Sequence, residues 1–96
     1  MAPGLKAGVA RAVITPPVGI THAHWGAQTH TRATGVDLEM WATALVVESG
    51  GTQVAIVDCD AGNFPKPIFE SIRDAIVALT GIPAGHVRVS ASHTHS

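Results

Sequence analysis

The sequence contains few residues of several types, and each shortage excludes a class of protein. Its 96 residues include one cysteine, two tryptophans, two phenylalanines and no tyrosine. A single cysteine excludes an internal disulfide framework and any zinc site built from several cysteines. Six Lys and Arg stand against seven Asp and Glu, a net charge of −1. The chain therefore lacks the basic surface that grips a phosphate backbone, and we expect no nucleic-acid partner.

Long apolar runs are also missing. No segment reaches the about 18 consecutive apolar residues that cross a bilayer, so we expect no transmembrane segment. The N-terminus has neither the basic nor the apolar region of a signal peptide, and by default this predicts a cytoplasmic protein. The sequence predicts no particular oligomeric state.

Histidine is the residue type in excess. The composition, 46% hydrophobic and 14% charged, is typical of one folded domain. The six histidines equal Lys and Arg in number, and five of them fall in two clusters: His22, His24 and His30, then His93 and His95. Because histidine is the commonest metal ligand, the clusters indicate a chemical site; solvated surface histidines are the alternative.

The N-terminal half predicts three strands and one long loop. Apolar residues alternate over Leu5–Thr15, which is typical of a strand, and Pro16 and Pro17 end it because proline donates no hydrogen bond to a sheet. Val18–Met40 has little periodicity and predicts an irregular loop. The β-branched runs Trp41–Glu48 and Thr52–Cys59, with Ser49–Gly51 between them, predict an antiparallel hairpin.

The rest of the chain predicts a helix and one more strand after Thr52–Cys59, which completes a strand-helix-strand unit. The run Val54–Val57 is nearly all apolar, so we expect the strand to be buried on both faces. Asn63 is a candidate cap for a helix that begins near Pro65, and Gly81 is a natural end. Its expected core stripe is Ile68, Ile72, Ile76 and Leu79. Alternation over His86–Ser92 then predicts the last strand.

These elements predict an α/β fold in which a mixed β-sheet contains a β-hairpin followed by a β-α-β crossover, as a fragment of a larger α/β domain. The two strands of a β-α-β unit are parallel. Asp58–Asp60 ends one of them and His93–Ser96 ends the other. Because ligands bind at the carboxyl edge of such sheets, we expect these side chains to meet at a site.

Several residue types at this edge suit metal or hydrolytic chemistry. His93 and His95 alternate, so a strand would place both imidazoles on one face, where both bind a metal or one acts on substrate. Asp58 and Asp60 either orient the histidines, ligate a metal directly or accept backbone N–H groups. Cys59 is either a small buried hydrophobe or a nucleophile with a histidine base.

Weaker candidates lie elsewhere. His22-Ala23-His24 is a second pair with the same spacing, but a loop does not guarantee a shared face. Arg32 and Lys66 are candidate contacts for an anionic group, although single basic residues are usually solvated. We assign no role to His30 or His86.

Three stretches, in this order, resemble the neutral/alkaline ceramidase family. They are Gly8–Ala10 with Ile14–Gly19, then Ala44–Val47 with Val54–Asp60, and finally Thr80–Pro83 with Ser92–Ser96, the last containing that family's His-Thr-His-Ser motif. The resemblance covers almost all of the chain. The chain departs from the family at Gly35–Glu39 and at His22–Gly26, two loops near the expected substrate mouth.

The resemblance implies zinc-dependent hydrolysis of a linear amide, with ceramide or a related N-acyl lipid as the substrate. It implies that His93 is a zinc ligand and that His95 is catalytic, stabilising the oxyanion. The family completes its site with another histidine, a glutamate and a tyrosine further along. Residues 1–96 are therefore expected to be the N-terminal part of the catalytic domain, inactive alone. The alternatives are another metal-dependent hydrolase that uses Asp58 and Asp60, and a non-catalytic module.

Overall fold

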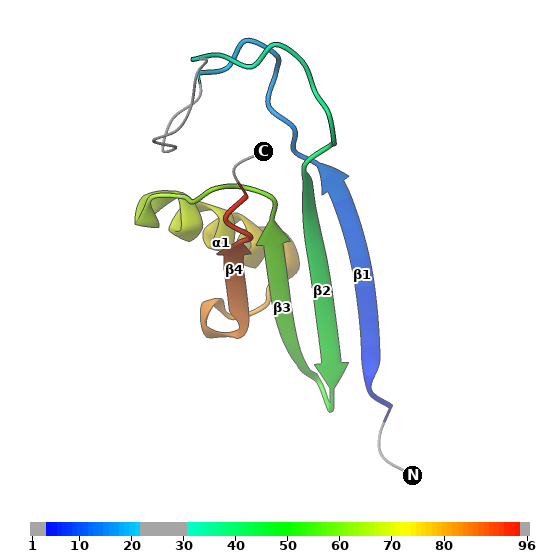
Figure 1. The fold of residues 1–96 in the computed structure, drawn as a ribbon. Helices are drawn as coiled ribbons and strands as arrows, with labels where there is room; N and C mark the ends of the chain where they lie inside the picture. The colour runs from blue at the N-terminus through cyan, green and yellow to red at the C-terminus, as the bar shows by residue number, and fades with distance from the viewer. Residues whose placement is uncertain (1–3, 22–30, 95–96) are drawn as a thin grey trace.

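The computed structural model describes residues 4–21 and 31–94. Within them the chain forms four strands, one α-helix and one short 3-10 helix (Figure 1). Their bounds are β1 Lys6–Val13, β2 Trp41–Ser49, β3 Thr52–Cys59, α1 Lys66–Thr80, η1 Ala84–His86 and β4 Val87–Ala91. All four strands belong to one sheet in the order β1-β2-β3-β4, antiparallel except for the parallel pair β3 and β4. The predicted α/β fold, with a hairpin followed by a β-α-β crossover, is confirmed.

A two-residue turn joins β2 to β3. Ser49 pairs with Thr52, so Ser49 belongs to the strand and Gly50 and Gly51 alone form the turn. Their φ angles are 57° and 81°. Positive φ at both central positions is the type I′ geometry that matches the twist of a hairpin, and glycine adopts it without a steric penalty.

The start of α1 differs from the predicted cap. Pro65 is the N-cap residue and makes no side-chain capping bond, whereas the Oδ1 atom of Asn63 accepts a hydrogen bond from the Phe64 N–H at 2.9 Å. The rings of Phe64 and Phe69 meet edge to face with centroids 5.3 Å apart. Because these residues precede the cap and occupy the fourth helical position, they form a hydrophobic staple that fixes where the chain enters the helix. The Asn63 prediction is therefore wrong.

The end of α1 is as predicted. Gly81 is the C-cap with φ 74°, and its N–H donates to the carbonyl of Val77. The left-handed conformation turns the chain out of the helix at low cost because glycine has no Cβ. The helix then leads through η1 into β4.

Helix α1 covers one face of the sheet next to β4 (Figure 1). The predicted stripe is only partly correct: Ile72 and Ile76 are half-buried, but Ile68 is exposed and Leu79 is 86% exposed. Among the described residues, the helix contacts the sheet chiefly at the short strand β4, which leaves Ile68 partly uncovered and Leu79 mostly uncovered. The buried apolar side chains of the described residues are Ala55, Cys59 and Ile82.

Strand β3 is buried on one face rather than on both, which corrects the prediction. Ala55, on the helix side, is 2% exposed, whereas Val54 and Ile56, on the other side, are each 40% exposed. Neighbours in register continue this open face: Val54 pairs with Val47, and Ile56 pairs with Leu45. An apolar run cannot reveal whether a second layer covers it, and the described residues include a helix on one side alone.

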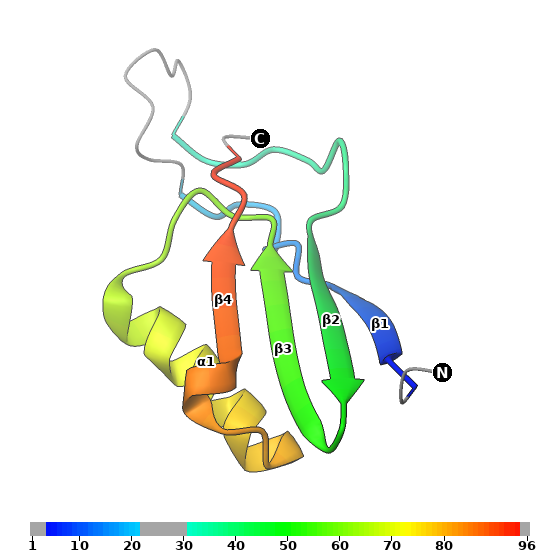
Figure 2. The same ribbon diagram turned by 90° about the horizontal axis from the view of Figure 1, so that it is seen from below.

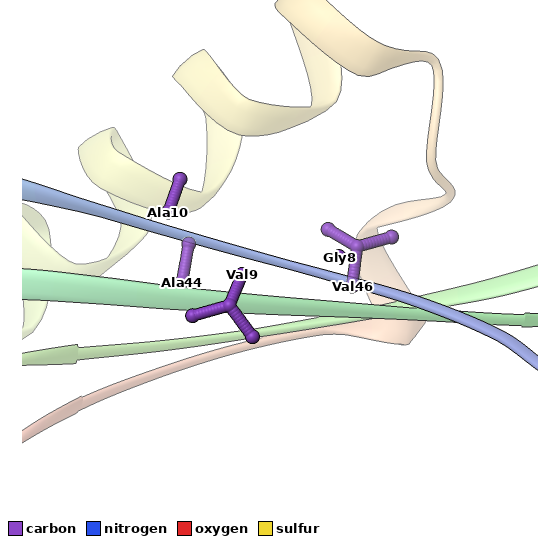
Figure 3. Close-up of a pocket in the computed structure, with 5 residues that line it drawn as sticks. All are labelled: Gly8, Val9, Ala10, Ala44 and Val46. Carbon is purple, nitrogen blue, oxygen red and sulfur yellow. The ribbon is translucent and has the colours of Figure 1, made fainter.

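A hollow of about 250 Å³ lies over β1 and β2. Figure 3 shows that Ala10, Ala44 and Val46 point to the helix side of the sheet and that Val9 points away from it; Gly8 completes the lining. These residues carry no titratable or polar side chain, so the hollow is a gap beyond the reach of α1 and not a chemical site.

No helix within residues 4–21 and 31–94 is long and apolar enough to cross a membrane.

Candidate functional site

Four chain segments meet at one edge of the sheet. Strands β1, β3 and β4 end there, and β2 begins there (Figure 2). The loop between β1 and β2 starts and finishes at the same edge, where the Ile14 N–H donates to the carbonyl of Met40 at 2.8 Å. The Thr15 hydroxyl accepts the Met40 N–H at 2.8 Å and donates to the carboxylate of Glu39. The topology therefore confirms that Asp58 near the end of β3, Asp60 after β3 and His93 after β4 lie at one edge of the sheet, and it adds this loop to them.

Asp58 is the last residue but one of β3 and is half-buried. Its neighbour on the parallel strand is Ser90, whose hydroxyl donates to Oδ1 of Asp58 at 2.9 Å. Thr43 is its neighbour on β2. The carboxylate thus accepts a hydrogen bond within the sheet, on the face opposite α1.

Asp60 follows β3 and turns to β2 instead. Its N–H donates to the carbonyl of Trp41 at 2.8 Å, and its Oδ2 accepts the N–H of Trp41 at 3.0 Å. Asp58 and Asp60 therefore bond to neighbours on opposite sides of β3. Of the alternatives for Asp60, acceptance of a backbone N–H is present in the structure, although from β2 rather than from the following turn.

His93 lies beyond β4, because the strand ends at Ala91. It is exposed and has a φ of 63°, the one positive value among the described non-glycine residues. Such left-handed geometry breaks the alternation of an extended strand. The argument that a strand places His93 and His95 on one face therefore fails, and His95 itself lies outside the described residues.

Cys59 is buried between the two aspartates. Burial, then the negative charges of Asp58 and Asp60, raise the pKa of the Cys59 thiol above its ordinary value. Because the thiolate is the nucleophile, a raised pKa disfavours nucleophilic chemistry at neutral pH. The structure supports the interpretation of Cys59 as a small buried hydrophobe.

Metal donors are sparse among the described residues. Within residues 4–21 and 31–94, no three His, Cys, Asp or Glu side chains lie close enough together to hold a metal ion. Zinc sites take three or four protein ligands, so the described residues do not by themselves fit a zinc ion, although the edge carries the exposed imidazole of His93.

The weaker candidates either contact residues other than Asp58, Asp60 and His93 or lie outside the described residues. Arg32 donates to the carbonyl of Gly19 at 3.2 Å, Lys66 approaches Glu70 at 3.8 Å on the exposed face of α1, and Nδ1 of His86 is 3.1 Å from the carbonyl of Gln53 at the far end of the sheet. The predictions for His22, His24 and His30 fall on residues outside the described ranges.

Sequence reasoning missed two contributions of Trp41 at this edge. Its backbone binds Asp60, and its ring lies under the guanidinium of Arg11, with 4.1 Å between the Arg11 Cζ atom and the ring centroid. An exposed cation–π contact of this kind contributes about 0.5–1 kcal/mol. For Asp60 the signal in the sequence was the hairpin register, which pairs Ala42 with Cys59 and so places Trp41 opposite Asp60.

No protein-family model and no curated protein sequence matches the chain. Among solved structures, the chain is similar to one described as a ceramidase complexed with C2, with a TM-score of 0.82 and 23% sequence identity. The similarity covers 100% of this chain and 15% of that chain, so the sequence spans a small part of that protein's length. At this identity the similarity shows the fold alone: the chain is similar in fold to one part of that ceramidase.

Proposed function

We propose that the chain is the N-terminal part of the catalytic domain of a zinc-dependent amide hydrolase of the neutral/alkaline ceramidase type. The observation that carries the proposal is the similarity in fold to a ceramidase over the entire chain. The His-Thr-His-Ser stretch that begins beyond β4 supports it, because His93 lies at the carboxyl edge where α/β sheets bind ligands.

The uncovered surfaces support the assignment to a larger domain. The face of the sheet opposite α1 exposes Val9, Val54 and Ile56, and the helix itself exposes Ile68 and Leu79. Apolar surfaces of this kind are usually covered by another part of the protein or by a partner. In the proposed enzyme, further layers of the same domain cover them.

In the proposed site, His93 holds the metal and His95 faces the reacting amide. Zinc, when bound, polarises a carbonyl and lowers the pKa of a bound water. The other ligands come from outside the described residues. The contribution of this chain is to present the His93 imidazole at an edge that it shares with the start and the end of the loop between β1 and β2. The substrate we propose is a lipid-like N-acyl compound such as ceramide.

The test uses the full-length protein that contains this sequence. Its zinc content and its hydrolysis of a fluorescent N-acylsphingosine are measured for wild type, His93→Ala and the control His86→Ala. His86 is exposed and lies at the opposite end of β4. We expect one zinc per chain in wild type, and a loss of metal with at least a 100-fold loss of activity in His93→Ala, on the order of the effect of removing a positioned catalytic group.

Three results would count against the proposal. Absence of N-acylsphingosine hydrolysis by the wild type removes the substrate class, and two metal ions per chain favour the other type of hydrolase. Equal activity and zinc content in His93→Ala and His86→Ala remove the role of His93. The 96-residue piece alone is expected to be inactive. Within residues 4–21 and 31–94, Asp58 and Asp60 belong to no group of three possible metal ligands, and one oxygen of each accepts a hydrogen bond, from Ser90 and from Trp41.

A further inference from the structure

The short loop that follows β3 is tied to the start of β2. Two hydrogen bonds join Asp60 to the same residue, Trp41, one through its backbone N–H and one through its carboxylate. The backbone bond extends the hairpin ladder by one residue, and the carboxylate satisfies the N–H at the start of β2. An aspartate at this position therefore fixes the loop against the sheet on the β2 side.

The same loop is tied to the segment that follows β4. The Ser92 N–H donates to the carbonyl of Cys59 at 3.0 Å, and the Thr94 N–H donates to the carbonyl of Ala61 at 3.2 Å. Donors and acceptors both advance by two residues, as in a parallel ladder. The pairing of β3 and β4 thus continues past the ends of both strands, and His93 lies between its last two donors.

His93 is in a conformation that needs such support. Its φ of 63° places a β-carbon-bearing residue in the left-handed region, which is sterically unfavourable for such residues. Such residues persist where the surrounding structure fixes them. The bonds of Ser92 and Thr94 hold the backbone on both sides of His93, so they set the direction in which its imidazole leaves the chain.

Gly62 lets this segment approach the loop. A β-carbon at position 62 would lie 3.3 Å from the carbonyl oxygen of Thr94, closer than such atoms normally pack. The backbone of Gly62 is not left-handed, so the need for glycine here is one of space. An alanine would require the Thr94 carbonyl to shift by a few tenths of an ångström, in the residue whose N–H donates to Ala61.

We propose that Asp60 and Gly62 are positioning residues for His93. Asp60 fixes the loop against β2, the loop carbonyls fix Ser92 and Thr94, and the left-handed His93 between them directs its imidazole to the sheet edge. Asp60 acts through hydrogen-bond acceptance and not through its charge. We call the hydrogen bonds made by Asp60, Ser92 and Thr94 the clamp. The catalytic consequence rests on the proposed function, whereas the clamp itself does not.

The variant Asp60→Asn separates the role of Asp60 as a hydrogen-bond acceptor from the role of its negative charge. The amide oxygen of Asp60→Asn still accepts the Trp41 N–H, whereas Asp60→Ala removes the acceptor. For the glycine, the matched control to Gly62→Ala is Gly85→Ala, because a β-carbon at position 85 meets nothing within 4 Å and that backbone is not left-handed.

Three measurements are made on the full-length protein for wild type and all four variants, after thermal unfolding shows that each is folded. Hydrogen exchange reports on the segment with the Ser92 and Thr94 amides. Nuclear magnetic resonance of labelled histidine, assigned with His93→Ala, reports on the imidazole of His93. Steady-state hydrolysis of N-acylsphingosine separates kcat from KM.

We expect Asp60→Ala and Gly62→Ala to speed exchange of this segment at least tenfold, shift or broaden the His93 resonance, and lower kcat about 10- to 100-fold with KM nearly unchanged. Asp60→Asn and Gly85→Ala should stay close to wild type in all three. If Asp60→Asn loses as much as Asp60→Ala, the charge acts and the proposal is wrong. Unchanged exchange and an unchanged His93 resonance in Asp60→Ala and Gly62→Ala also overturn it. A wild type without hydrolytic activity overturns the proposed function instead, while exchange and resonance still decide the clamp.

Discussion

The hydroxyl of Ser90 donates a hydrogen bond to Oδ1 of Asp58, 2.9 Å away, directly across the parallel pair of β3 and β4. The two residues are 32 positions apart in the sequence, so the bond forms only when the crossover through α1 has closed. It ties the carboxylate of Asp58, near the end of β3, to the neighbouring strand β4. The bond therefore couples the stability of the β-α-β unit to the geometry of the edge.

Removing this hydroxyl should destabilise the protein. We expect Ser90→Ala to lower the free energy of unfolding by about 1–2 kcal/mol, because a half-buried carboxylate loses a donor. Urea denaturation measures the change. The control is Ser71→Ala on the exposed face of α1, which should stay within about 0.5 kcal/mol of wild type. Equal stability of the two variants would show that water replaces the hydroxyl without cost.

The two histidines of the terminal motif should separate in their kinetics. If His95 stabilises the developing oxyanion, His95→Ala keeps the metal and lowers kcat by about 100- to 1,000-fold with KM little changed. His93→Ala loses both metal and activity. Metal analysis combined with kinetics on the full-length protein distinguishes the two outcomes. Loss of metal in His95→Ala would make that residue a ligand instead.

The hairpin turn offers a stabilising substitution. Gly50 has φ 57° in a type I′ turn, where Asn-Gly is the preferred pair. Gly50→Asn should match or exceed wild-type stability by a few tenths of a kcal/mol, because it restricts the unfolded chain. Gly50→Val should lower stability by at least about 1 kcal/mol, since a β-branched side chain is strained at positive φ. Thermal unfolding of the two variants should therefore shift in opposite directions, and equal shifts would contradict the type I′ assignment.

The thiol of Cys59 should make stability depend on alkaline pH. Burial and the two flanking aspartates raise its pKa in the folded protein, whereas the unfolded chain ionises near the ordinary value of about 8.5. Above that pH the unfolded state binds fewer protons than the folded state, so the free energy of unfolding falls as pH rises toward the folded pKa. Below it, this contribution is fully present.

Urea denaturation between pH 7 and pH 10 measures the effect, with Cys59→Ala as the comparison. The variant loses packing at every pH, so the slope rather than the absolute stability is compared. We expect the wild type to lose stability more steeply than Cys59→Ala. Parallel curves would mean that the pKa of this thiol is not raised by folding.

Local patterns in the sequence were sufficient for the order of elements. The alternation before Pro16, the Gly50-Gly51 pair and Gly81 each act within a few residues, and the strands and helix begin and end close to the predicted positions. The errors arose where a local pattern has two solutions. Asn63 resembles a cap, but the Phe64–Phe69 contact fixes the start of the helix. The apolar run of β3 is compatible with one covered face or two.

Part of the candidate site could likewise be predicted from the sequence, and part could not. The meeting of Asp58, Asp60 and His93 at one edge follows from the rule that β-α-β strands are parallel, which needs no knowledge of packing. The partners of the two aspartates were not predictable, because Ser90 and Trp41 belong to the neighbouring strands β4 and β2. The same holds for the left-handed His93, whose conformation depends on hydrogen bonds to a loop more than 30 positions away.

By itself, the sequence determined the class of fold, the positions of the turns and the edge of the sheet at which the chemistry-bearing residues lie, because each depends on local periodicity or on the chirality of a crossover. Tertiary structure alone decided which face of the sheet is covered, which neighbour each aspartate binds and how the chain passes through His93. These properties depend on contacts between segments that are distant in the sequence, and such contacts exist only once the sheet has assembled.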